Sequence, residues 1–134
     1  MRIDLGDTVP FLPEEVHLFH NRKKMLRWHV ERFGTKPMLD DMAHAQAVMR
    51  NGIAAVLIEV VDVPQWEYAL LVHEAYHIVC WHLSELGEEC AGEEITAYML
   101  QLLSGALMGA HKKWRKKHVR DEEGQLCRSD GGDL

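Results

Sequence analysis

The chain has 134 residues, of which 47% are hydrophobic and 27% are charged, and its formal net charge is −6 with histidine neutral. This length and composition are typical of one folded globular domain and exclude an intrinsically disordered chain. The acidic balance argues against nucleic acid as a partner, and the longest apolar runs are too short to span a membrane. The three cysteines lack a paired spacing and no apolar signal segment is visible, so we expect a cytoplasmic protein with reduced thiols.

A first helix is predicted to begin after Pro13 and to end at Gly34. Glu14 and Glu15 suit a first helical turn, and glycine is common just after a helix ends. The two prolines within residues 9–13 favour an extended entry or an edge strand before this helix. Apolar residues recur at roughly helical spacing along it, at Val16, Phe19, Met25, Leu26, Val30 and Phe33. Its three histidines share no ligand spacing and are interpreted as packed or solvated side chains: His17, His20 and His29.

A β-hairpin is predicted around Asn51-Gly52, because both positions of a tight two-residue turn need positive φ. The two strands of the hairpin are residues 43–50 and 53–61. Residues 53–58 are apolar throughout, which is typical of a strand buried on both faces. The first strand contains several polar residues and is therefore expected at an edge of the sheet.

Two helices are predicted to follow, from about Gln65 to about Leu86 and from Glu93 to roughly His111, with Gly87 ending the first of them. The predicted fold class is α+β: an N-terminal helix, a small antiparallel hairpin or sheet, and then these two helices. We expect residues 1–112 to form a single domain. Residues 113–134 are basic and then acidic, and are predicted to be a partly disordered tail.

The chemistry of the chain is concentrated in His73-Glu74-Ala75-Tyr76-His77, an H-E-x-x-H motif on the first of these two helices. Two histidines four residues apart project from the same helix face, about 40° apart around the axis. Both imidazoles can therefore reach one tetrahedral zinc ion, at roughly 2.0–2.1 Å. Glu74 can point toward the open coordination position and act as general base for a zinc-activated water.

A catalytic zinc needs a third protein ligand. His82 is excluded because it lies about 140° around the helix from His77 and about 180° from His73. Cys80 lies only about 60° from His77, but free cysteines are most often simply buried, so a packing role is favoured.

The remaining candidates for the third zinc ligand are Glu93 and Glu94, at the start of the next helix. Glu94 is preferred, because its helix face continues through Ala97, Tyr98 and Gln101, and Glu93 would then be a capping or supporting residue. Tyr98, or alternatively Tyr76, is a candidate to stabilise an oxyanion.

The arrangement of His73, Glu74, His77 and Glu94 resembles that of minimal gluzincin-type zincins, and it is similar to small phage- and prophage-encoded zincin-like proteins. It is more distantly similar to the ImmA/IrrE-type peptidases, in which a glutamate after the H-E-x-x-H helix is followed four residues later by an aromatic, here Tyr98. The resemblance covers about residues 43–107. It departs at Ile95, where a small residue is usual, and at Tyr76, where glycine is common. It implies an edge strand that holds an extended peptide, and residues 43–50 are the candidate.

We therefore expect a zinc-dependent metallopeptidase that hydrolyses peptide bonds in a peptide or protein substrate. Zn²⁺ would be held by His73, His77 and Glu94, and the catalytic residues would be Glu74 and Tyr98. The alternative is a zincin scaffold that binds the metal but acts as a protein-interaction module without proteolysis, in a phage-related setting. A helical hairpin without metal is the third reading of the same residues.

Overall fold

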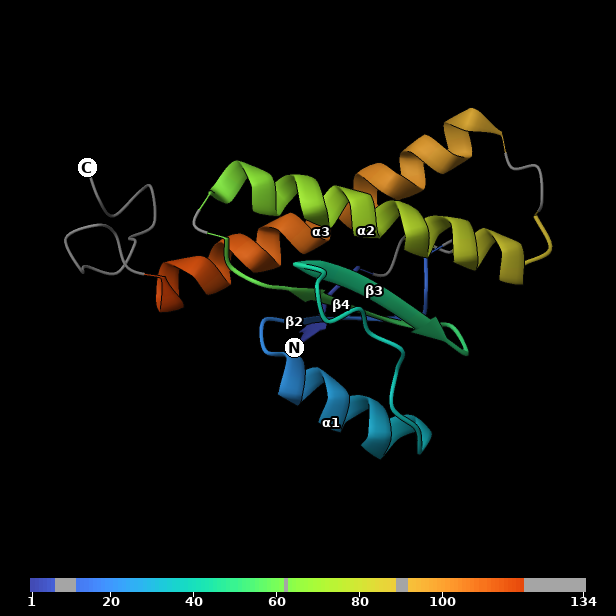
Figure 1. The fold of residues 1–134 in the computed structure, drawn as a ribbon. Helices are drawn as coiled ribbons and strands as arrows, with labels where there is room; N and C mark the ends of the chain where they lie inside the picture. The colour runs from blue at the N-terminus through green and yellow to red at the C-terminus, as the bar shows by residue number, and fades with distance from the viewer. Residues whose placement is uncertain (7–11, 62, 89–91, 120–134) are drawn as a thin grey trace.

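The computed structural model describes residues 1–6, 12–61, 63–88 and 92–119, and it shows an α+β fold built on one four-stranded sheet. Helices α2 and α3 cross over one face of the sheet, and α1 lies against the other face (Figure 1). Part of the expected N-terminal entry and the tail from residue 120 onward lie outside the described residues. The elements in chain order are β1 (Arg2–Ile3), β2 (Glu15–Phe19), α1 (Arg22–Phe33), β3 (Ala45–Arg50), β4 (Ile53–Ile58), α2 (Pro64–Glu85) and α3 (Glu93–His118).

The sheet is mixed, with strand order β1-β2-β4-β3. The predicted hairpin of β3 and β4 is confirmed, and β3 is the edge strand. Asn51 and Gly52 both have positive φ, at 53° and 76°, as a tight two-residue turn requires. The predicted antiparallel arrangement holds for β3 with β4 and for β1 with β2, but it is wrong for β2, which pairs in parallel with β4.

The first helix begins later than predicted. Residues 15–19 form β2 instead of a first helical turn, and α1 starts after Asn21, whose side chain accepts a hydrogen bond from the Lys24 amide. Asparagine is a strong helix N-cap, so the cap and not the acidic pair sets this boundary. The predicted end at Gly34 is confirmed, since this residue forms the C-cap with φ 77°.

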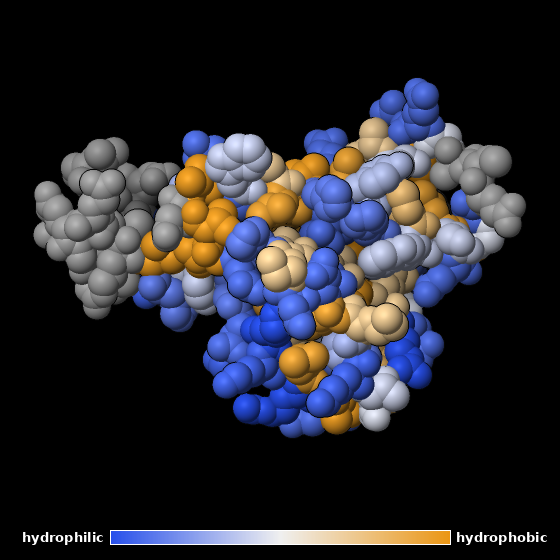
Figure 2. Space-filling view, in the orientation of Figure 1, coloured by the Kyte–Doolittle hydropathy of each residue, from blue (hydrophilic) through white to orange (hydrophobic). Residues whose placement is uncertain are grey.

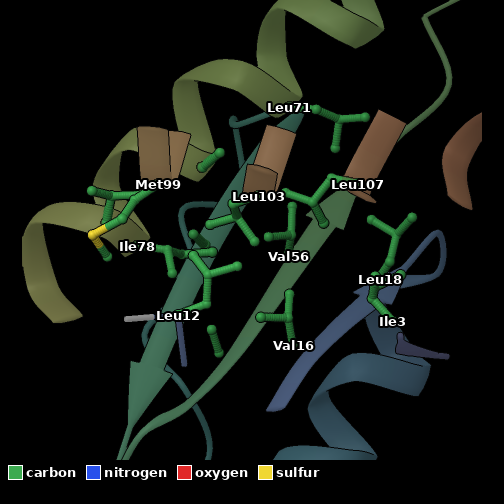
Figure 3. Packing of buried hydrophobic residues seen from close by; sticks show 14 of the residues in the cluster. Ile3, Leu12, Val16, Leu18, Val56, Leu71, Ile78, Met99, Leu103 and Leu107 are labelled. Atoms are coloured by element: carbon green, nitrogen blue, oxygen red, sulfur yellow. The ribbon is translucent and has the colours of Figure 1, made fainter. Parts of the chain in front are cut away.

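The core has two parts, one on each face of the sheet. Alternate residues of β4 supply both: Ala54, Val56 and Ile58 face α2 and α3, while Ala55 and Leu57 face α1. The prediction that this strand is buried on both faces is therefore confirmed. Figure 3 shows the larger part, in which side chains from the sheet meet those of α2 and α3: Val16, Val56, Leu71, Ile78, Met99, Leu103 and Leu107. The α1 side of the surface is largely hydrophilic in the space-filling view (Figure 2).

The two long helices match their predicted positions, and α3 continues to His118, so the basic residues 112–117 belong to its last turns. Basic side chains there offset the helix dipole. None of the helices that the structure describes combines the length and apolar content needed to cross a bilayer.

Candidate functional site

Helix α2 presents the H-E-x-x-H motif at the boundary between its buried and exposed faces. Residues spaced by three and four along α2 are buried against the sheet and α3, at Leu71, Glu74, Ala75, Ile78, Val79, His82 and Leu83. His73 and His77 lie on the adjoining exposed face. The helix thus holds the two imidazoles toward solvent and turns the glutamate between them toward the sheet.

The two histidines of the motif converge. The Nε2 atoms of His73 and His77 are 3.1 Å apart, and the two rings are inclined at 74°. Two imidazole nitrogens on one tetrahedral zinc at roughly 2.0–2.1 Å lie about 3.3 Å apart, close to the observed separation. The ring of His77 also stacks on Trp81, with centroids 5.6 Å apart, which supports its orientation. The separation of the two nitrogens allows a hydrogen bond between the rings, and it is also compatible with binding of both to one zinc ion.

Glu74 is buried, and its carboxylate meets the edge of the sheet. Its Oε2 atom accepts a hydrogen bond of 2.7 Å from the backbone N–H of Ala47 in β3. The carboxylate is thereby fixed against the edge strand β3, while the histidine pair lies on the adjoining exposed face of the same helix.

The edge of β3 carries backbone groups that point away from the sheet. The Glu59 N–H donates to the carbonyl of His44, 2.8 Å away, so the even-numbered residues of this strand bond to β4. The N–H and C=O groups of Ala45, Ala47 and Met49 therefore point outward. In the part of the chain that the structure describes, these outward groups make one hydrogen bond, from the Ala47 N–H to the Glu74 carboxylate. The edge is open to an added strand.

The predicted third ligand, Glu94, is not brought to the histidines. Glu67 of α2 and His111 of α3 are hydrogen-bonded, which sets the level at which these antiparallel helices pass. By that register His77, ten residues after Glu67, lies level with about Gln101, ten residues before His111. Glu94 is seven residues nearer the turn, about 10 Å along the axis at 1.5 Å per residue. Among residues 1–6, 12–61, 63–88 and 92–119, no three His, Cys, Asp or Glu side chains gather closely enough to hold a metal ion.

The other candidate site residues differ in how exposed they are to solvent. His82 is buried on the face of α2 opposite to the histidine pair, in agreement with its exclusion as a ligand. Cys80 is a free, half-buried thiol. Glu93 and Glu94 are exposed in the first turn of α3, and Tyr98 is 57% exposed. The roles of Glu94 as ligand and of Tyr98 as oxyanion donor therefore stay predictions.

A second polar cluster was not predicted from the sequence. The fully buried Glu67 carboxylate accepts hydrogen bonds from the Val61 N–H at 2.9 Å, from Arg115 at 2.8 and 3.0 Å, and from His111 Nε2 at 2.7 Å. We call Glu67, His111, Arg115 and His20 the Glu67 cluster. The spacing of His111 and Arg115 by four residues on α3 is the only local signal of it, because the partners come from three separate segments.

The hydrogen bonds of the Glu67 cluster define its proton positions. A carboxylate only accepts, so His111 carries its proton on Nε2, and its Nδ1 accepts from Nε2 of His20 at 2.9 Å. Burial, followed by the nearby charge of a protonated His111, lowers the pKa of His20 to about 3, and its ring stacks on Trp114 at 3.7 Å. Burial also lowers the pKa of His111, although its hydrogen bond to Glu67 opposes this shift. Both rings are therefore neutral near pH 7.

Comparison with protein-family models, curated proteins and solved structures found no match to this chain.

Proposed function

We propose that the chain is a zinc-dependent peptidase in which His73 and His77 bind the metal and Glu74 is the general base. The observation that carries the proposal is the 3.1 Å separation of the two Nε2 atoms, next to a buried carboxylate at an open sheet edge. Zinc bound there would lower the pKa of a water molecule to near neutrality and polarise a peptide carbonyl. The resemblance to minimal gluzincins points to the same reaction class.

The assignment of Glu74 as general base is supported by its contact with the sheet edge. Its Oε2 atom is held by the Ala47 N–H, and its other oxygen has no hydrogen bond to the described residues. That second oxygen would take the proton of the attacking water and then pass it to the leaving amine nitrogen. The outward backbone groups of Ala45 and Met49 would hold the substrate by strand addition.

Glu94 and Tyr98 belong to the proposal as third ligand and oxyanion donor. For Glu94 to reach the histidine pair, the first turns of α3 would have to move by about 10 Å along α2, given the rise of 1.5 Å per residue. The distance from Glu94 to the pair favours a second candidate function, in which the scaffold binds metal through the histidines and works as a protein-interaction module without proteolysis.

Elemental analysis and a cleavage assay separate these functions. Full-length protein purified after expression with zinc is expected to hold about one zinc per chain, and His73→Ala is expected to lose it. His44→Ala, which changes an exposed histidine outside the motif, is the matched control and should keep the metal. Absence of zinc from the wild-type protein would refute both candidate functions.

Cleavage of a mixed peptide library then tests the reaction itself. The wild-type protein should cut it, and Glu74→Gln should retain zinc while cleavage falls by at least a hundredfold, as expected on removing a general base. Zinc binding without cleavage by the wild type would favour the interaction module. Loss of zinc in Glu94→Ala would support Glu94 as the third ligand, and retention of full zinc affinity would contradict that assignment.

A further inference from the structure

A hollow of about 400 Å³ runs along the outward side of β3. One wall is formed by residues 35–38, which follow α1, and the other by Trp81 of α2. The floor includes Ala47, whose N–H holds Glu74. The hollow is therefore connected to the proposed general base through Ala47, and it follows the edge of β3 to which a strand could be added.

The charges in the hollow have one sign. Its lining includes Lys36 and Arg50 and contains no aspartate or glutamate. The Arg50 guanidinium donates to Thr35 Oγ1 at 2.8 Å and lies 5.5 Å from the centre of the Phe33 ring, so it is held at the end of the strand. Lys36 is exposed, and no hydrogen bond or ion pair to its side chain is present within the described ranges.

The hollow also has an apolar side. Met49 and Trp81 border it from the α2 face, and Met38 lines the opposite wall while 92% exposed. Tryptophan and methionine are common at binding surfaces, where they provide a large and adaptable apolar contact. The side chain of Arg50 lies on the α1 face of β3, whereas that of Met49 lies on the α2 face, because strand residues alternate.

We propose that this hollow binds an extended peptide with an acidic residue directly next to an apolar or aromatic one. The acidic side chain contacts Lys36 and Arg50, and its neighbour packs on Met49 and Trp81. The two must be adjacent in the peptide, because successive side chains of an added strand point to opposite faces of the sheet. This inference rests on the proposed function in one respect, because it names the class of peptide that the proposed peptidase would bind at the β3 edge.

Fluorescence anisotropy with two labelled hexapeptides tests the inference directly. The peptides are otherwise identical and carry either Glu-Phe or Lys-Phe at the centre, and the full chain is kept in EDTA so that no zinc-dependent cleavage occurs. The Glu-Phe peptide is expected to bind at least tenfold more tightly at low salt, with the difference shrinking as salt is added. Equal affinity for the two peptides would overturn the inference.

Variants assign the preference to the hollow. Lys36→Gln should reduce the preference, Lys36→Glu should reverse it, and Lys23→Gln, an exposed lysine on α1 outside the hollow, should leave it unchanged. A preference that survives Lys36→Glu would overturn the inference even if the peptide binds. A failure of zinc binding or cleavage would instead refute the proposed function and leave this binding result standing.

Discussion

Replacing Glu67 by glutamine should destabilise the fold substantially. The wild-type carboxylate is fully buried and neutralises Arg115, whose side chain is only 12% exposed. Glutamine preserves the volume of the side chain and one acceptor oxygen, but it removes the charge and turns an N–H donor toward groups that donate to the carboxylate. Removing one partner of a buried ion pair costs about 3–5 kcal/mol, and the slight exposure of Arg115 to water favours the lower end of that range, about 3 kcal/mol.

Urea denaturation at pH 7.5, followed by circular dichroism, measures this free energy of unfolding. Glu59→Gln is the matched control, because Glu59 also pairs with an arginine, Arg22, at 2.9 Å, but its side chain is 41% exposed. An exposed pair of this kind is worth about 0–1 kcal/mol. If Glu67→Gln lost no more stability than Glu59→Gln, the reasoning that the Glu67 cluster fixes the helix pair would be refuted.

Two further predictions concern zinc and pH. Zinc at one hundred times its dissociation constant should stabilise the wild-type protein by about 2.7 kcal/mol. In a thermal-shift assay, His77→Ala should lose this stabilisation and His44→Ala should keep it. An equal zinc response in His77→Ala would contradict the assignment of His77 as a ligand. Acid should destabilise the fold, because burial lowers the folded-state pKa of His17, His20, His82 and His111 below the ordinary 6.5. The unfolded state then binds more protons, so the stability contributed by these groups is complete above pH 6.5 and is lost as the pH falls toward their folded pKa values, about 3 for His20. One such histidine accounts for at most roughly 2 kcal/mol of lost stability at pH 5, and for less after solvent screening. His20→Gln should therefore flatten the decline in the free energy of unfolding, measured with urea, between pH 6.5 and 5. An unchanged slope would contradict a lowered pKa of His20 as a cause of the acid destabilisation.

Local patterns in the sequence predicted the elements whose boundaries depend on local chemistry. The turn at Asn51-Gly52 and the helix end at Gly34 both follow from the positive φ that these residues adopt readily. The strand β2 was missed because its stability comes from pairing with β4, far along the chain. Val16 and Phe19 match a helical spacing equally well, and only the long-range pairing decides between the two periods.

The candidate site also combines local features, which the sequence predicts, with long-range features, which it does not. His73 and His77 lie within one helix, so the spacing of four residues is enough to bring their nitrogens together, as observed. Glu94 lies on another helix. The spacing of residues on a helix face shows the direction in which Glu94 points around the axis of α3, but it does not show how far along α2 the residue lies. The relative position of the two helices along their axes depends on the hydrogen bond between Glu67 and His111, which local spacing could not reveal. The position of Ala47 beneath Glu74 likewise depends on how α2 crosses the sheet.

The central place of β2 in the sheet has a consequence for the order of folding. The β3–β4 hairpin is local, and hairpins of this kind form in about 1–10 μs. The parallel pairing of β2 with β4 must instead close the long segment that contains α1 and β3, and contacts of such high sequence separation slow folding. The hairpin should therefore form early with both of its edges unpaired. β2 then covers the β4 edge, and the edge beside Glu74 is the one that the finished fold leaves open.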